Sequence, residues 1–361
     1  MRILIGQRSI PSFSQRIIEW QRQHGRHGLP WQGVDAYRVW LSEVMLQQTQ
    51  VATVLPYYQR FVARFPDIAT LAAASEDDVL VHWSGLGYYS RARNLHRAAQ
   101  LVMQQHGGKF PQHFEDILEL PGIGRSTAAA ISAFVFHQRR AILDGNVKRV
   151  LARYCAIEGY TGEKKIEEQL WLQAEALLPE SDVASYTQGL MDLGALLCTR
   201  SKAQCTLCPL HSNCIAYQRG LVAQLPTPRP RKRMPEKNST FLLLLHGSDI
   251  LLEKRPGSGI WGGLWCPPQL DVGQDVNAHC MQQFNVDTGQ GLALPVFTHT
   301  FSHFKLHITP LYLEVVQKPS QTQERGRAWL NIEDALQAAI PAAVRKILRV
   351  LLAQRTLEGL D

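Results

Sequence analysis

CTRSKAQCTLCPLHSNC, residues 198–214, holds four of the seven cysteines in the chain and is the stretch from which the fold can be inferred. Cys198, Cys205, Cys208 and Cys214 follow the spacing C-x6-C-x2-C-x5-C. A disulfide framework needs many cysteines in a small secreted domain, so neighbouring thiols here are more typical of a metal site. Four thiolates suit tetrahedral zinc or an iron–sulfur cluster. Because only the middle pair forms a short zinc-like knuckle, the spacing favours a [4Fe–4S] cluster over zinc, and either over idle thiols.

The cysteine loop also carries two cations, Arg200 and Lys202, between its first two cysteines. Folding of the loop around a metal would fix both side chains at its surface, next to an anionic partner. The whole chain is basic, with 38 Lys and Arg against 31 Asp and Glu, a net charge of +7 and a pI near 9.1. This balance favours a polyanion such as nucleic acid as the partner.

The length of 361 residues is enough for two or three domains with cores of their own. No apolar run approaches the ~18 residues of a membrane-spanning helix, and residues 1–11 lack the apolar segment of a signal peptide. We therefore expect no membrane association and a cytoplasmic location, where thiols stay reduced.

Three regions differ in their hydrophobic pattern. Residues 12–225 are predicted to be helical almost throughout. Residues 226–239 are rich in proline and basic side chains without an apolar period, which predicts a semi-rigid linker. Residues 240–361 show both strand-like and helix-like patterns. Their pattern predicts strands at 240–246, 250–253 and 304–316 and a last helix that begins at Pro341.

A short turn, Leu-Pro-Gly-Ile-Gly at residues 120–124, separates two helical segments, the second predicted at 126–136. Pro121, Gly122 and Gly124 favour a tight turn whose free N–H groups point outward at a helix N-terminus. Such a terminus binds phosphate readily. An ordinary helical hairpin is the alternative for this motif alone.

Two carboxylates have sequence neighbours that perturb their pKa values. Glu43 lies among apolar residues of a predicted helix, so burial should raise its pKa and leave a proton to donate. Asp144 follows an apolar run and precedes a predicted helix, where capping and the helix dipole should hold it ionised. Shifts in opposite directions predict an acid and an anionic stabiliser.

Several motifs together resemble a known family. The helix–hairpin–helix, the aspartate within residues 143–147 (LDGNV) and the cysteine loop resemble the endonuclease III superfamily of DNA base-excision glycosylases. Three further stretches resemble adenine DNA glycosylases of the MutY type, which remove adenine mispaired with 8-oxoguanine. These stretches are residues 41–50 (LSEVMLQQTQ), 85–89 (GLGYY) and 301–304 (FSHF). The resemblance covers nearly the whole chain from about Phe13.

The resemblance implies a role for each candidate residue. Glu43 would give a proton to the departing adenine, and Asp144 would stabilise the sugar cation that develops. The cysteines would hold a [4Fe–4S] cluster. The implied DNA contacts are Gln48, Tyr88, Gly122, Gly124, Ser126, Asn146, Arg200 and Lys202. The implied adenine pocket consists of Leu29, Trp31, Val51 and Gln188.

Ser126 bears on the reaction class. Relatives with lyase activity carry a lysine at this position, and its amine attacks the sugar to form a Schiff base. A serine hydroxyl cannot form that adduct, so we expect a monofunctional glycosylase that uses water as its nucleophile.

The region after the linker resembles a Nudix (MutT-like) fold, in which hydrolases hold Mg²⁺ with a helix of glutamates. Here the matching stretch offers only Asp271 and Asp275, so we expect no hydrolase activity. The resemblance instead implies that the loop of Phe301, Ser302 and His303 reads 8-oxoguanine. From the pattern alone, a strand start with two core phenylalanines is the alternative.

The predicted fold class is therefore multidomain: an all-α helix–hairpin–helix core with a [4Fe–4S] loop, then an α+β Nudix-like domain. The core is expected at 1–225, with a six-helix part at about 30–139 and an iron–sulfur part formed by the N-terminal helix and 140–225. The linker covers 226–239 and the second domain 240–361.

The predicted function is base excision repair by hydrolysis of the glycosidic bond of adenine opposite 8-oxoguanine or guanine. We expect a monomer that acts on double-stranded DNA at a bacterial nucleoid. The alternatives are an endonuclease III-like pyrimidine glycosylase with lyase activity and a non-enzymatic iron–sulfur DNA-binding protein. Ser126 and the C-terminal domain disfavour the first, and the two carboxylates disfavour the second.

Overall fold

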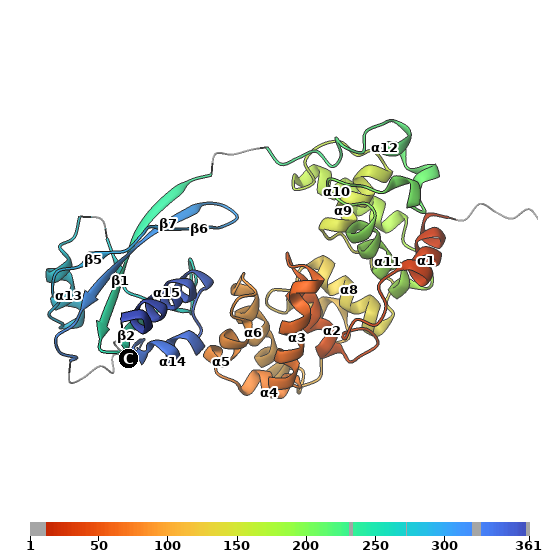
Figure 1. Ribbon diagram of the computed structural model, residues 1–361. Helices are drawn as coiled ribbons and strands as arrows, with labels where there is room; N and C mark the ends of the chain where they lie inside the picture. The colour runs from red at the N-terminus through yellow and green to blue at the C-terminus, as the bar shows by residue number, and fades with distance from the viewer. Residues whose placement is uncertain (1–11, 231–233, 272, 320–325, 359–361) are drawn as a thin grey trace, which may run out of the picture. The chain divides into compact units, whose positions relative to one another are not determined.

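The computed structural model describes residues 12–230, 234–271, 273–319 and 326–358 (Figure 1). Contacts divide the chain into two compact units, Met1–Ala69 with Arg97–Arg231 and Thr70–His96 with Lys232–Asp361. Among the described residues, no helix has the length and apolar character needed to cross a membrane.

The first unit is helical, as the sequence predicts. Its helices are α1 (Phe13–His24), α2 (Ala36–Leu46), α3 (Val51–Arg64), α7 (Phe114–Glu119), α8 (Arg125–Phe136), α9 (Gly145–Tyr154), α10 (Lys164–Ala176), α11 (Val183–Leu196) and α12 (Ile215–Gln218), with short 3₁₀ turns η1 (Cys205–Leu207) and η2 (His211–Asn213). Helix α1 begins at a capping box, because the side chains of Ser12 and Gln15 each accept a hydrogen bond from the other's backbone N–H. Its buried face, with Ile17 and Ile18, packs against α11.

Helix α11 approaches two neighbours closely because it carries glycines at the contacts. A Cβ added to Gly189 would lie 2.7 Å from Cγ2 of Ile17 in α1. A Cβ added to Gly194 would lie 2.6 Å from the Cβ of Asn146 in α9. Both glycines are buried, so no larger residue fits at either position without moving a helix.

Two helices, α4 (Ile68–Ala73) and α6 (Ser90–Gln105), cross the boundary between the units, and α5 (Glu76–Trp83) belongs to the second. The segment 70–96, which the sequence places in the helical core, thus belongs to the same compact unit as the C-terminal part. Within the second unit, Arg93 donates a hydrogen bond to the carbonyl of Gly262, and Lys254 pairs with Asp77 at 2.7 Å. The predicted domain boundaries remain predictions.

The second unit is built on a mixed sheet of order β3-β2-β1-β7-β5, with β4 beside β1, β6 beside β7 and β8 beside β2. The strands are β1 (Glu236–His246), β2 (Asp249–Lys254), β3 (Trp265–Cys266), β4 (Gln269–Leu270), β5 (Leu292–Ala293), β6 (Phe297–Thr300), β7 (Lys305–Glu314) and β8 (Arg327–Asn331), and the helices are α13 (Val276–Phe284), α14 (Ile332–Gln337) and α15 (Ala342–Glu358). Strands β1 and β7 run parallel, with Leu242 opposite Leu311. Helix α13 packs its Cys280 and Phe284 into a cluster with Leu242 and Leu244 of β1.

The predicted hairpin is confirmed, because β1 and β2 pair antiparallel with Leu245 opposite Ile250. Strand β1 begins earlier than predicted, at Glu236, inside the stretch interpreted as linker. Its first residues are exposed, which hides any apolar period, but they pair in parallel with β7 from Lys305 onward. The backbone hydrogen bonds of a partner strand distant in sequence therefore extend this strand, and local pattern does not reveal them.

We predict that Gly189→Ala lowers the free energy of unfolding by about 1–3 kcal/mol, because the added methyl group overpacks the contact with Ile17. Urea unfolding followed by far-UV circular dichroism measures the change. Gly145→Ala is the matched control, since its Cβ would meet nothing within 4 Å and alanine favours a helix. Equal losses in both variants would contradict the close-packing argument.

Candidate active site

Glu43 projects from α2, the helix whose N-cap is Asp35, with the Asp35 side chain accepting a hydrogen bond from the N–H of Arg38 at 3.0 Å. The flanking Ser42 and Val44 are buried. Burial, and to a lesser extent the nearby charge of Asp144, together raise the pKa of the Glu43 carboxyl to about 8. At neutral pH this carboxyl keeps its proton, as the sequence predicts.

Asp144 is the N-cap of α9, as predicted. Its Oδ1 accepts a hydrogen bond from the N–H of Val147 at 2.8 Å, and its Oδ2 accepts one from the Asn146 amide at 3.2 Å. These bonds satisfy donors that a helix start leaves free. The capping aspartate is thereby held in one orientation.

The expectation of opposite pKa shifts is wrong in one respect. Burial raises the pKa of Asp144 as well, and this is the largest influence on it. The hydrogen bonds from Val147 and Asn146 and the charge of Arg149 oppose that rise. Within the described residues, Glu43 accepts no hydrogen bond. The two carboxyls are therefore distinguished by their donors rather than by their burial, and the donors around Asp144 favour its charged form.

Both carboxyls face one cavity of ≈ 670 Å³ in the first unit. The other predicted site residues that line it are Leu29, Trp31, Gln48, Val51, Ser126, Asn146, Gln188 and Arg200. The structure thus brings together residues from α2, α8, α9, α11 and the loops around them. Gly122, Gly124 and Lys202 are exposed and do not line this cavity.

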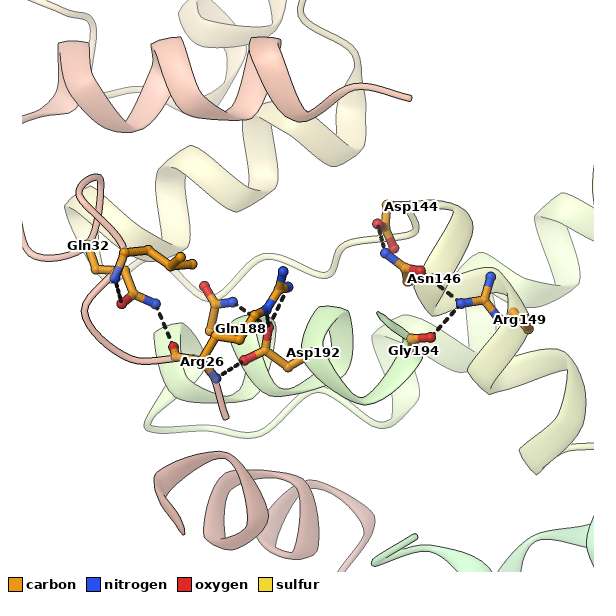
Figure 2. Close-up of polar contacts among 9 residues, drawn as sticks. Arg26, Gln32, Asp144, Asn146, Arg149, Gln188, Asp192 and Gly194 are labelled. Carbon is orange, nitrogen blue, oxygen red and sulfur yellow. Dashed lines mark hydrogen bonds and ion pairs between the residues drawn. The ribbon is translucent and has the colours of Figure 1, made fainter. Parts of the chain in front are cut away.

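One wall of the cavity is held by a polar network that the sequence does not reveal (Figure 2). Arg26, in the loop after α1, pairs with Asp192 of α11 at 2.6 Å. Gln188 donates to the same carboxylate at 2.8 Å. The Gln32 amide bonds the carbonyl of Arg26 at 2.9 Å and the N–H of Leu29 at 3.0 Å. These contacts fix the loop that carries two pocket residues predicted from the sequence.

A second network runs along α9. Arg149 donates to Asn146 Oδ1 at 2.8 Å and to the carbonyl of Gly194 at 2.6 Å (Figure 2). Its Nε donates to the carbonyl of Cys198 at 2.7 Å. One guanidinium therefore connects the residue that bonds Asp144 with the first residue of the cysteine loop.

The predicted hairpin turn lies between α7 and α8. Gly122 has a φ of +80°, a conformation that favours glycine, and Gly124 is the N-cap of α8. Both are exposed, so the backbone there is open to a ligand. Ser126, predicted to contact DNA, has an internal partner as well: its Oγ accepts a hydrogen bond from the N–H of Leu143 at 3.0 Å.

The four cysteines of the loop line one small, mainly apolar space between α9, α11 and α12. Arg153 of α9 donates to Sγ of Cys198 at 3.3 Å and to the carbonyl of Thr199 at 2.7 Å. Among the described residues, no group of three or more His, Cys, Asp or Glu is arranged to hold a single metal ion. Four thiols around a common space, with a cation donating to one sulfur, fit the donor set of an iron–sulfur cluster.

The remaining predicted residues belong to the second unit. Tyr88 is 46% exposed in the turn between α5 and α6. Ser302 and His303 are exposed at the tip between β6 and β7, with Ser302 Oγ and His303 Nδ1 3.4 Å apart. Phe301 stacks on the buried Phe304, with ring centroids 4.5 Å apart. The two phenylalanines therefore form packing contacts, while the polar pair faces outward.

The residues missed by sequence reasoning differ in how they could have been found. Asp192 lies between the apolar Met191 and Leu193 in a helical pattern, and a charge at such a position indicates a buried partner. The role of Arg149 can be inferred from its position on α9 only once the cysteine loop is known to lie beside that helix. Arg26 lies in a loop without any period, so no local signal identifies it.

Comparison with known proteins agrees with this geometry. Residues 41–175 match the HhH-GPD superfamily of base excision DNA repair proteins, and residues 240–350 match the NUDIX domain. An adenine DNA glycosylase of Buchnera aphidicola subsp. Schizaphis graminum is 39% identical over 94% of this chain and 98% of its own length. The adenine DNA glycosylase of Homo sapiens is 34% identical over 96% of this chain and 75% of its own.

Solved structures agree on the helical fold. A thermostable thymine-DNA glycosylase is 27% identical, with a TM-score of 0.51 over 57% of this chain and 95% of its own. Endonuclease III in a non-covalent DNA complex is 18% identical and shares the fold, with a TM-score of 0.50 over 58% of this chain and 94% of its own. The predicted fold class is confirmed. The extent of the likeness to the Buchnera and human proteins shows that the chain belongs to the adenine DNA glycosylase family of base excision DNA repair enzymes.

Proposed function

We propose that this adenine DNA glycosylase hydrolyses the glycosidic bond of adenine opposite 8-oxoguanine or guanine, with Glu43 as the acid and Asp144 as the anionic stabiliser. The observation that supports this is the difference between two carboxyls lining one cavity. Glu43 is raised in pKa to about 8 without a hydrogen bond to its carboxyl among the described residues, whereas Asp144 has donors that favour its charged form.

The proposed reaction consists of proton transfer to the base, cleavage of the glycosidic bond and addition of water to the sugar. Glu43 gives its proton to the adenine ring as the bond to the sugar breaks, and the bonding electrons leave with the base. The sugar is left as an oxocarbenium ion beside the Asp144 carboxylate, which offsets the positive charge. Water adds to the sugar carbon and loses a proton to the Glu43 carboxylate. The products are free adenine and an abasic site.

Ser126 limits the chemistry to this hydrolysis. Its hydroxyl lines the cavity but is engaged with the N–H of Leu143. No amine occupies this position to form a Schiff base, so strand cleavage is not part of the proposed reaction.

Access to the adenine requires that the base leaves the duplex. Gln48 and Tyr88 are both exposed, with φ values of 57° and 49°. Non-glycine residues in this left-handed region are strained, and such strain concentrates at functional sites. We propose that both contact the DNA helix where the base has been withdrawn, while Gly122, Gly124, Arg200 and Lys202 contact phosphates.

The cysteine loop supports DNA binding through its metal. Cys198, Cys205, Cys208 and Cys214 would hold a [4Fe–4S] cluster, which when bound supplies a rigid centre for the loop. Arg153 braces the first of these thiols. The loop then presents the exposed Arg200 and Lys202 to DNA. A basic monomer of this kind would work at the bacterial nucleoid.

The second unit supplies recognition of the lesion. Ser302 offers a hydroxyl and His303 a ring at an exposed tip, while Phe301 is anchored on Phe304. We propose that the hydroxyl bonds the edge of 8-oxoguanine and that the neighbouring rings stack beside it. In α13, which precedes this tip, the described residues lack the glutamate cluster that Mg²⁺ would require.

We predict that Glu43→Gln lowers the single-turnover rate of adenine release at least ~100-fold while leaving DNA affinity unchanged, because only the transferable proton is lost. The unmodified protein should lose activity as pH rises through about 8, where Glu43 ionises and can no longer donate. Glu168→Gln, an exposed glutamate of α10, is the control. A Glu43→Gln rate above about a tenth of normal would exclude Glu43 as the acid.

We predict that purified protein is brown and contains four iron atoms per chain. Cys208→Ser should lose the iron and weaken DNA binding, because the loop bearing Arg200 and Lys202 loses its centre. Cys155→Ser is the control, since Cys155 does not line the space formed by the other four thiols. Stoichiometric zinc without iron in anaerobically prepared protein would refute the assignment.

We predict that Ser302→Ala combined with His303→Ala lowers the preference for 8-oxoguanine:A over G:A about tenfold, because the lesion loses one polar contact. Paired single-turnover assays on the two duplexes measure the preference. Thr300→Ala, an exposed change in the same hairpin, should leave it intact. Unchanged discrimination in the double variant would rule out this tip as the reader.

A further inference from the structure

A fully buried carboxylate lies next to Gln188, one of the residues that line the cavity. Asp192 of α11 has no exposed surface. Its Oδ1 accepts a hydrogen bond from Arg26 Nε at 2.7 Å and forms an ion pair with Arg26 Nη2 at 2.6 Å, and its Oδ2 accepts a hydrogen bond from the backbone N–H of Arg26 at 2.7 Å. A buried charge is tolerated only when it is paired in this way, and charge-assisted bonds of this kind are strong and directional. The carboxylate is therefore fixed in place.

Gln188, one helical turn earlier, lies between this carboxylate and the cavity. Its Nε2 donates to Oδ1 of Asp192 at 2.8 Å. Because a carboxylate paired with arginine can only accept, the amide must turn its nitrogen toward Asp192. Its oxygen consequently points away from Asp192 (Figure 2), and Gln188 lines the cavity together with Glu43 and Asp144. Asp192 thus determines which end of the amide the cavity receives.

We propose that Asp192 is a positioning residue for substrate choice: it holds the Gln188 amide so that its oxygen accepts a hydrogen bond from the 6-amino group of adenine. This inference rests on the proposed function of the cavity. One edge of adenine carries an acceptor at N7 beside a donor at N6. A protonated Glu43 and an accepting Gln188 form the complementary pair, donor and acceptor, on the protein side.

The same arrangement excludes bases with oxygen at position 6. Hypoxanthine and guanine would place a carbonyl against the Gln188 oxygen, and two acceptors facing each other leave both unsatisfied. A free glutamine amide could rotate to present its nitrogen to such a carbonyl. The bond to Asp192 prevents that rotation, so selectivity comes from a side chain that does not itself line the cavity.

The test uses full-length protein and two duplexes that carry adenine or hypoxanthine opposite the same 8-oxoguanine. Asp192→Asn should lower the ratio of the single-turnover rates, adenine over hypoxanthine, about tenfold or more. The new amide nitrogen must face either the backbone N–H of Arg26 or the pair formed by Arg26 Nε and Gln188 Nε2, so the bonds that hold Gln188 cannot all form. A purely structural role would lower both rates by the same factor. An unchanged ratio in folded, iron-loaded protein would overturn the proposal.

A second variant keeps the test decisive if Asp192→Asn fails to fold. Gln188→Leu removes the acceptor at similar volume and should lower the ratio to the same extent. The two changes together should have no larger effect than either alone, since they remove one interaction. A ratio that survives Gln188→Leu would also overturn the proposal.

Asp182→Asn is the matched control, because Asp182 pairs with Arg22 at 2.8 Å beside the same two helices but on the exposed surface. It should leave both rates unchanged. Failure of the unmodified protein to release adenine would instead contradict the function proposed for the cavity. Normal adenine release with an unaffected ratio in the variants would contradict only the role of Asp192.

Discussion

The close packing of α11 against α1 and α9 is the constraint on which the first unit depends. Gly189 and Gly194 remove the side chains that would hold these helices apart. At that distance, α11 delivers Gln188 to the cavity, offers the carbonyl of Gly194 to Arg149, and leads directly into Cys198. A single helix therefore sets the positions of the cavity wall that carries Gln188, the capping aspartate and the start of the cysteine loop.

The difference between the two carboxyls of the cavity depends on their hydrogen-bond donors more than on how deeply each is buried. Burial raises the pKa of both carboxyls, so burial alone could not assign an acid and a stabiliser. The N-terminus of α9 makes the distinction, because it supplies Val147 and Asn146 as donors to one carboxyl only. Asn146 is in turn held by Arg149, and Arg149 by the cysteine loop. The charge state of the aspartate is thus coupled to the folding of a loop beyond the cavity.

Local sequence was sufficient to predict the features that depend only on the spacing of nearby residues. The cysteine run, the capping position of Asp144 and the buried Glu43 were all predicted, because each depends on residues within a few positions. The start of β1 was missed, since its hydrogen bonds come from β7. The pKa direction of Asp144 was wrong because burial is a sum over distant segments. Asp192 and Arg26, 166 residues apart, form a pair that no local pattern could show.

The hydroxyl of Ser126 constrains how this family could exchange one chemistry for another. Its bond to the N–H of Leu143 anchors the backbone directly before Asp144. A lysine ammonium has no lone pair with which to accept that bond. A protonated lysine at this position would therefore lose the contact that holds the backbone before Asp144, so residue 126 acts both on the nucleophile available and on the position of the aspartate.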